Sequence, residues 1–101
     1  DAELAAYFES VARLHGDPLV AARWVLGPLR AASLERSLPF DLLAVRVRPA
    51  DLAALLDRRR DGAIDDAEAE RVFERMTRTG EPPARAIDRL AREGGATRVR
   101  R

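Results

Sequence analysis

The chain has 101 residues, of which 47% are apolar and 35% are charged, and its formal net charge is +1. This length suits one domain with a modest core and excludes a large multi-lobed catalytic apparatus. Cysteine is absent and His15 is the single histidine, which excludes disulfide scaffolds, thiolate zinc sites, cysteine nucleophiles and multi-histidine metal sites. The chain contains no apolar run of about 18 residues, so we expect no membrane span. Because it starts at Asp1 without a signal-peptide profile, we expect a piece of a longer protein.

All 18 basic residues are arginine, and lysine, asparagine and glutamine are absent. A GC-rich genome explains this bias without any reference to function. The position of the charges is more informative, because residues 1–45 carry 4 arginines against 6 acids, whereas residues 71–101 carry 9 arginines against 4 acids. Positive charge therefore collects towards the C-terminal end.

The apolar spacing in the first part of the chain is helical. A stripe at i, i+3, i+4, i+7 and i+10 predicts a helix over residues 4–14 that ends at Gly16. Asp17 followed by Pro18 is typical of an N-cap with proline at the first helical position, and it predicts a second helix. The stripe of the first helix consists of Leu4, Tyr7, Phe8, Val11 and Leu14.

Gly27 and Pro28 interrupt the second helix. A proline inside a helix removes a hydrogen bond and clashes one turn back, so we expect a kink or a break before helix resumes over residues 29–36. In the segment 37–48, residues 40–44 could form a helical turn, whereas residues 45–48 alternate apolar and arginine like a strand. We interpret this segment as an extended connection to Pro49, the first residue of a third helix.

The third helix is predicted to end at Gly62. Asp65 and Glu68 have the spacing of a capping box and predict the start of a fourth helix. That helix carries a regular apolar stripe and should end at Gly80. The stripe consists of Ala69, Val72, Phe73 and Met76.

A fifth helix is predicted to begin at Pro82 and Pro83, with Ile87 and Leu90 facing inward, and to stop at the Gly94-Gly95 pair. We therefore expect an all-α fold in which about five short helices form a small bundle. Residues 1–101 should form a single helical domain, with N-terminal helices over 1–45, C-terminal helices over 46–95 and a frayed tail over 96–101.

A segment near the middle of the chain resembles an EF-hand calcium loop. Such a loop needs oxygen ligands at positions 1, 3, 5 and 9, glycine at 6 and glutamate at 12. Arg59 occupies position 3, and Arg58 and Arg60 add positive charge beside it, so we expect no metal here. The residues that fit are Asp57, Asp61, Gly62, Asp65 and Glu68, together with Ile64 at position 8, which takes an apolar residue. Of these, Gly62, Asp65 and Glu68 have a simpler interpretation as helix caps.

Arginines recur with helical spacing in the C-terminal third. Two triplets at i, i+4 and i+7 each line one helix face, and the fixed fork of arginine matches the geometry of a phosphate. The alternative is a solvated face whose charges are compensated locally, since Glu74 precedes Arg78 by four residues and Asp88 precedes Arg92 by four. The candidate nucleic-acid contacts are Arg71, Arg75, Arg78, Arg85, Arg89 and Arg92.

No sequence pattern points to catalysis. The aromatic residues fall on the apolar stripes, which favours the core over a base-stacking surface. Adjacent carboxylates such as Asp65 and Asp66 are typical of a helix start, and no glycine-rich phosphate loop or nucleophile elbow is present. We expect no catalytic residue and no metal site in this chain.

Five segments follow one another in the order and spacing of a known family. They are Tyr7-Phe8-Glu9, Ala21-Ala22-Arg23-Trp24-Val25, Leu52-Ala53-Ala54-Leu55-Leu56, Asp61-Gly62-Ala63-Ile64-Asp65, and Val72 to Pro83 followed by Ile87. Together they resemble the C-terminal tail of the B subunit of aspartyl/glutamyl-tRNA amidotransferase, the GatB/YqeY family. Arg23 stands where the family usually has asparagine, and Gly94-Gly95 replaces its usual Gly-Leu.

The resemblance implies a non-catalytic helical domain that binds tRNA and positions mischarged tRNA for transamidation. In that family, subunits A and C respectively release ammonia from glutamine and clamp the assembly, while the body of the B subunit activates the tRNA-bound carboxylate with ATP and Mg²⁺. The resemblance thus implies that this domain is part of an ATP-dependent carbon–nitrogen ligase. The implied partners are tRNA(Gln) or tRNA(Asn) and subunits A and C, in the cytoplasm, with no cofactor in this domain.

Two other functions stay open on the sequence alone. One is a helical protein–protein docking module that presents an apolar groove to a partner. The other is a calcium-sensing helix-loop-helix, whose thermal stability would rise on adding calcium. Binding to phosphates weakens steeply as the salt concentration rises, whereas binding in an apolar groove hardly depends on salt. The salt dependence of binding therefore distinguishes the docking module from a tRNA-binding domain.

Overall fold

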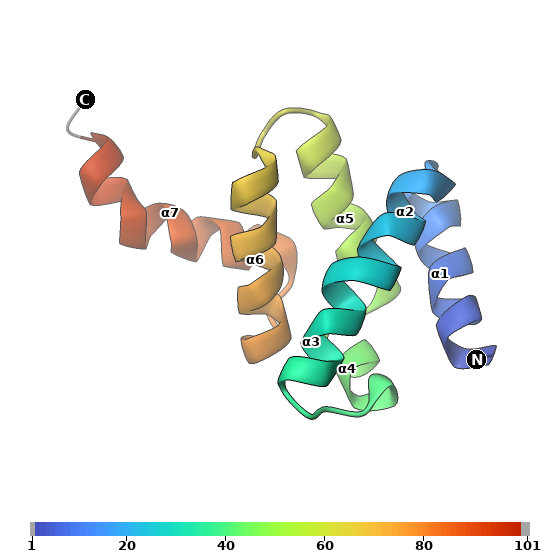
Figure 1. Ribbon diagram of the computed structural model, residues 1–101. Coiled ribbons are helices and arrows are strands. Elements are labelled where there is room, and N and C mark those ends of the chain that lie inside the picture. Colours follow the sequence, from blue (N-terminus) through green and yellow to red (C-terminus); the bar gives the residue numbers. More distant parts are fainter. Residues whose placement is uncertain (1, 100–101) are drawn as a thin grey trace.

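The computed structural model describes the backbone of residues 2–99 and the side chains of residues 2–93. Within residues 2–99 the chain is helical with short connections and forms no strand, which confirms the all-α prediction. The elements are α1 (Ala2–His15), α2 (Pro18–Trp24), the π-helical turn η1 (Val25–Leu29), α3 (Arg30–Glu35), α4 (Phe40–Arg46), α5 (Pro49–Arg60), α6 (Asp66–Thr79) and α7 (Pro83–Val99). Figure 1 shows α2, η1 and α3 following one another as a single helical run.

Most helix ends lie where the capping signals predicted them. The Asp17 carboxylate accepts the backbone N–H groups of Leu19 and Val20, both at 3.2 Å, at the start of α2. Asp65 and Glu68 form the predicted capping box of α6, with reciprocal bonds of 2.8 and 2.9 Å. These side chains satisfy backbone donors that the first turn of a helix leaves without partners.

Gly80 ends α6 with a φ of +79°, in the left-handed region that disfavours residues with a side chain. At the end of α5, the backbone N–H of Ala63 donates to the carbonyl of Arg58 at 3.0 Å, and that of Gly62 donates to Arg59 at 3.2 Å. This pair of bonds is a Schellman motif, which confirms that α5 ends around Gly62.

The interruption predicted at Gly27-Pro28 takes the form of the π-helical turn η1. Proline lacks the N–H that an α-helical bond would need, and its ring clashes with the carbonyl four residues earlier. A widened turn accommodates both problems without breaking the helix. The chain therefore passes from α2 into α3 without a loop.

The prediction of an extended connection over residues 37–48 is wrong for residues 40–46, which form α4. Of the alternating residues 45–48, Val45 and Arg46 belong to α4, and the extended backbone is confined to Val47 and Arg48. The apolar–arginine alternation imitated a strand, but α4 instead buries Leu43 and leaves Val45 exposed. With α2–η1–α3 counted as one run, residues 2–99 form six helices, one more than the about five that we predicted, because of α4.

The prediction that α7 stops at Gly94-Gly95 is also wrong, because its helical backbone continues to Val99. Glycine weakens a helix by about 1 kcal/mol per residue relative to alanine, but it does not end one by itself. Of the tail predicted to fray, residues 96–99 are helical, and residues 100 and 101 lie outside the described part of the chain.

The core is centred on α5, which packs against α1 and α2 as well as against α6 and α7 (Figure 1). Leu52, Leu55 and Leu56 have no exposed surface. Trp24 and Phe73 meet edge to face with their ring centroids 5.6 Å apart, which joins α2 to α6. The aromatic side chains are buried or half-buried, as their places on the apolar stripes predicted.

Two buried polar contacts tie α1 to the rest of the bundle. The Tyr7 hydroxyl donates to the carbonyl of Val47 at 2.5 Å, and burial, with a smaller contribution from Asp51, raises the pKa of Tyr7. His15 is buried, and its Nδ1 lies 2.6 Å from the Asp57 carboxylate of α5. Arg60 bonds both the His15 carbonyl and Asp57, at 3.0 and 3.3 Å. The ends of α1 and α5 are thereby fixed to each other.

Replacing Asp65 by alanine removes one half of the capping box. We expect Asp65→Ala to lower the free energy of unfolding by about 1 kcal/mol, measured by urea denaturation followed by circular dichroism. The matched control is Glu70→Ala, which removes an exposed carboxylate from the same helix and should change stability by less than about 0.5 kcal/mol. Equal effects of the two variants would contradict the role of the cap.

Candidate nucleic-acid interface

The six candidate arginines lie on α6 and α7, the helices on either side of the Gly80 turn, and they do not form one face. Five of them are exposed, whereas the Arg75 side chain keeps 14% of its surface exposed. Arg75, Arg85 and Arg89 line a hollow of about 490 Å³ at the turn, together with Thr79, Gly80, Glu81 and Pro82. Arg71 lines a separate groove between α6 and α7.

Arg75 is held inside the protein by two carboxylates. Its Nε lies 3.1 Å from Glu81, and its Nη1 lies 2.9 Å from Glu93 on α7. Arg89 approaches the other oxygen of Glu81 at 3.1 Å, and the Thr79 hydroxyl lies 3.0 Å from Glu81. We call this set the turn clamp: Arg75, Thr79, Glu81, Arg89 and Glu93. It fixes α7 against the end of α6.

The charges of the turn clamp stabilise one another. The hydrogen bond with Glu93, joined by that with Glu81, raises the pKa of Arg75 against the effect of desolvation. Partial burial opposes the ionisation of Glu81, but hydrogen bonds from Thr79 and Arg75 and the charge of Arg89 outweigh it and lower the pKa of Glu81. The guanidinium group of Arg75 thus contacts carboxylates of the protein itself. Its role is to position α7 against α6.

Arg78 and Arg85, on either side of the turn, are exposed and form no ion pair with another described residue. The Glu74 carboxylate, which we expected to compensate Arg78, lies instead 3.4 Å from Arg36 of the loop after α3. The pair expected between Asp88 and Arg92 is present at 3.2 Å, but both side chains are exposed, and such pairs contribute about 0–1 kcal/mol.

Arg46 adds a cation that the sequence analysis did not select. Its Nη1 donates to the carbonyls of Thr77 and Arg78, at 3.2 and 3.4 Å, at the C-terminal end of α6. A cation is favourable there because the carbonyls at the end of a helix carry partial negative charge. The signal was hidden because Arg46 stands in the apolar–arginine alternation that we interpreted as extended. We call Arg46, Arg78 and Arg85 the basic turn.

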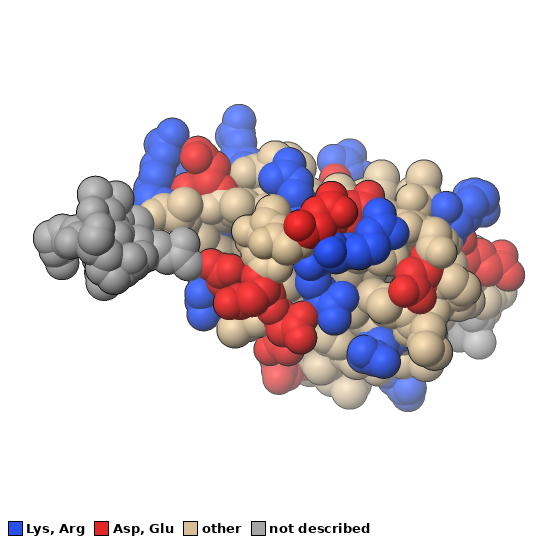
Figure 2. Space-filling model, turned by 90° about the horizontal axis from the view of Figure 1, so that it is seen from above, with Lys and Arg blue, Asp and Glu red and all other residues tan. Residues whose placement is uncertain are grey.

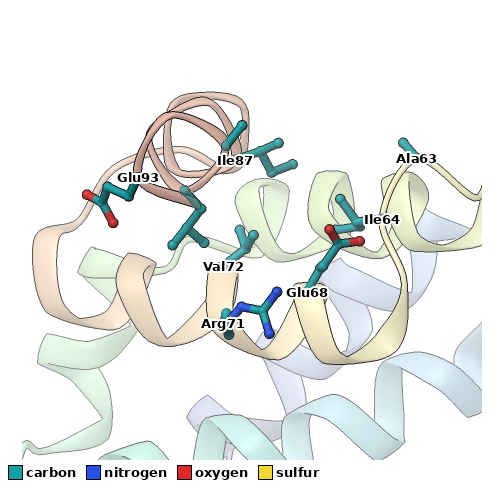
Figure 3. A pocket seen from close by; sticks show the side chains of 9 residues that line it. Ala63, Ile64, Glu68, Arg71, Val72, Ile87 and Glu93 are labelled. Carbon is teal, nitrogen blue, oxygen red and sulfur yellow. The ribbon is translucent and has the colours of Figure 1, made fainter. Parts of the chain in front are cut away.

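Arg71 lies apart from the basic turn, at the edge of a groove of about 460 Å³. Figure 3 shows Ile64, Val72 and Ile87 on the inner side of this groove, with Glu68, Arg71 and Glu93 at its edge. The charged residues that line the groove are thus two glutamates and one arginine. The charge around Arg71 is mixed, unlike that of the basic turn.

The end of the molecule opposite the basic turn also carries mixed charge. Figure 2 views the bundle from the side of the α5–α6 connection, where blue and red residues are interspersed. Arg59 lies 2.6 Å from Asp66 there, and Arg60 lies 3.3 Å from Asp57. A polyanion would meet carboxylates together with arginines on this surface.

The EF-hand-like segment has a different geometry from a calcium loop. Asp57 and Arg59 lie inside α5, which continues to Arg60. Asp57 contacts His15 and Arg60, while Asp65 and Glu68 are engaged in the capping box. Across the part of the chain that the structure describes, no group of three or more histidines or carboxylates is placed to hold a metal ion.

Among the described residues, no helix is both long enough and apolar enough to cross a membrane.

Comparison with known proteins finds a family model and relatives that match most of the chain. A family model described as the GatB domain matches residues 6–92. A relative from Chlorobium phaeobacteroides is 37% identical over 86% of this chain and 18% of its own length. A relative from Clostridium botulinum is 34% identical over 84% of this chain and 17% of its own length, and one from Thiobacillus denitrificans is 41% identical over 70% and 14%. No solved structure matches.

The match over nearly the whole chain shows that this protein belongs to the GatB domain family. The three relatives are each named as the B subunit of aspartyl/glutamyl-tRNA(Asn/Gln) amidotransferase. The chain spans less than a fifth of the length of these curated relatives. The resemblance inferred from the five sequence segments is therefore confirmed at the level of the family.

Replacing Glu81 by glutamine tests the turn clamp. Since the pKa of Glu81 is lowered in the fold, its ionised form stabilises the protein above the ordinary glutamate value of about 4.5. This contribution is lost as the pH falls through the lower folded value. We expect Glu81→Gln to lower the Tm at pH 7, and the difference from wild type to shrink below about pH 4.5.

The control for this experiment is Glu70→Gln, which alters an exposed carboxylate on α6 that lies outside the turn clamp. Its Tm should follow that of the wild type at every pH. A constant difference between Glu81→Gln and wild type, down to the lowest pH at which both stay folded, would contradict the electrostatic role of Glu81.

Proposed function

We propose that this chain binds the folded body of a tRNA, as the tail of the B subunit of an amidotransferase. The observation that carries the proposal is the basic turn, in a chain whose relatives are named as tRNA amidotransferase subunits. Arg78 and Arg85 are exposed and lack carboxylate partners among the described residues, so their guanidinium groups are available to phosphate oxygens. The forked guanidinium suits such contacts, which position an RNA without reading its sequence.

The remaining candidate arginines differ in how available they are to an RNA phosphate. Arg89 and Arg92 are exposed and are held by ion pairs with Glu81 and Asp88, so a phosphate would have to compete with a carboxylate for them. Arg71 extends the contact surface along α6. Arg75 acts as a positioning residue, because the turn clamp sets the direction of α7 and with it the place of Arg85.

We assign no catalytic step to this chain. Several carboxylates of the described residues, including Asp65, Glu68 and Asp57, are engaged in a cap or an ion pair, and His15 is buried against Asp57. The residues present do not fit ATP or Mg²⁺, since the sequence has no glycine-rich phosphate loop and the described residues form no cluster of three carboxylates. We propose that ATP and Mg²⁺ act elsewhere in the parent ligase. This ligase would amidate mischarged tRNA(Gln) or tRNA(Asn) with glutamine as the amide donor. Its other partners would be subunits A and C, and it would act in the cytoplasm.

The proposal is tested by titrating the chain into labelled folded tRNA at several salt concentrations, with duplex DNA as the comparison ligand. Binding should favour tRNA and weaken steeply with salt. The variant with Arg78→Ala and Arg85→Ala should bind about tenfold or more weakly, and its salt slope should fall by about 2, one for each lost phosphate contact.

The matched control removes the same charge from another surface, with Arg13→Ala and Arg30→Ala. Both residues are exposed and lie outside α6 and α7, so the affinity should change by less than about twofold. Equal losses in the two double variants would mean that only net charge matters and would contradict the basic turn. Undetectable binding at low salt, or equal binding of duplex DNA, would contradict tRNA binding itself.

A further inference from the structure

The solvent-facing side of the α2–η1–α3 run carries an unusual alternation. Leucine and arginine follow one another at i, i+4, i+7, i+11 and i+15, and all five side chains are exposed. The three leucines keep 57–75% of their surface exposed. Single exposed leucines are ordinary, but three along one helix face indicate a contact surface. We call this set the Leu/Arg face: Leu19, Arg23, Leu26, Arg30 and Leu34.

An apolar groove of about 300 Å³ adjoins the Leu/Arg face between α1 and the α2–η1 run. Leu26 belongs to both the face and the groove wall. All of the lining residues are apolar: Leu4, Ala5, Phe8, Ala22, Val25 and Leu26. The surface thus offers a concave site for inserted side chains beside a row of exposed leucines, which is the geometry of helix-in-groove recognition.

The charge of the Leu/Arg face selects one kind of partner. Residues 18–34 contain Arg23 and Arg30 and no acidic residue. Neither arginine forms an ion pair with another described residue, whereas Arg36, Arg48 and Arg59 each do. We propose that the Leu/Arg face and its groove dock an amphipathic helix of another protein or subunit, which presents an apolar stripe bordered by aspartate or glutamate.

Gly27, in the π-helical turn, supports close approach of such a helix. It is exposed, its backbone lies outside the left-handed region, and a Cβ added there would meet nothing within 4 Å. The fold therefore gives no reason for a glycine at this position. A partner helix lying across the turn gives one, because glycine lets another backbone come close.

The leucines and arginines of the Leu/Arg face disfavour three other partners for this surface: a second copy of the chain, RNA and a membrane. A second copy related by a two-fold axis would place Arg23 and Arg30 against their own equivalents. RNA would gain nothing from three exposed leucines. A membrane that buried the three leucines would also draw in Arg23 and Arg30 from the same row without offering them carboxylate partners.

The test uses two synthetic helical peptides of about 18 residues that share one leucine stripe and differ only in bordering glutamate or lysine. Titration into the 101-residue chain, followed by isothermal calorimetry, should show about tenfold or tighter binding of the glutamate peptide. Leu26→Asp should weaken that binding about tenfold or more. Leu42→Asp alters a leucine of similar exposure on α4 and should leave the affinity within about twofold.

Charge reversal gives the sharpest result. The variant with Arg23→Glu and Arg30→Glu should prefer the lysine peptide. An unchanged preference after this reversal, no discrimination between the peptides by the wild type, or equal losses in Leu26→Asp and Leu42→Asp would each overturn the proposal. Circular dichroism establishes that the variants stay folded.

Two further measurements exclude the other occupants. Sedimentation that shows a dimer dissociated by Leu26→Asp would assign the surface to a second copy and overturn the proposal. Binding to anionic lipid vesicles that depends on Leu26 would overturn it in favour of a membrane. Leu26→Asp should retain tRNA affinity, so failure of this inference is distinguishable from failure of tRNA binding.

Discussion

The burial of α5 on two opposite sides is the constraint on which the rest of the structure depends. Leu52, Leu55 and Leu56 are completely buried, and each contributes about 1.5–3 kcal/mol through loss of apolar surface. Because α1 and α2 cover one side of α5 while α6 and α7 cover the other, the two halves of the chain share one core. This arrangement leaves two separate surfaces exposed, one on α2–η1–α3 and one at the α6–α7 turn.

At the α6–α7 turn the fold divides the arginines between a partly buried one held by carboxylates and exposed ones without an ion pair among the described residues. Arg75 is enclosed by Glu81 and Glu93, and it holds α7 at a fixed angle to α6. Arg78 and Arg85, on either side of the same turn, keep their guanidinium groups exposed. Preorganisation of this kind lowers the cost of binding, because the cations are placed before a ligand arrives. The carboxylates that neutralise Arg75 therefore serve the basic turn indirectly.

Sequence signals that act within one helical turn predicted much of the fold. The features that they did not predict depend on contacts between residues distant in the sequence. Proline, glycine and capping residues gave the ends of α2, α5 and α6, because their effects act within one turn. The same rules failed for α4, where burial of Leu43 overrode an alternating pattern, and for α7, which continues past two glycines. Helical spacing found the candidate arginines and the local Asp88–Arg92 pair but not the partners of Arg75, since the Arg75–Glu93 pair forms only when α6 and α7 pack together. Spacing alone thus could not separate Arg75 from Arg78.

Amide hydrogen exchange of the whole chain, measured with and without saturating folded tRNA, tests the central claim most directly. The account predicts added protection around the α6–α7 turn, over residues 77–92, and little change over residues 18–35. Protection confined to residues 18–35, or bound tRNA that leaves the turn unprotected, would contradict an interface built on the basic turn.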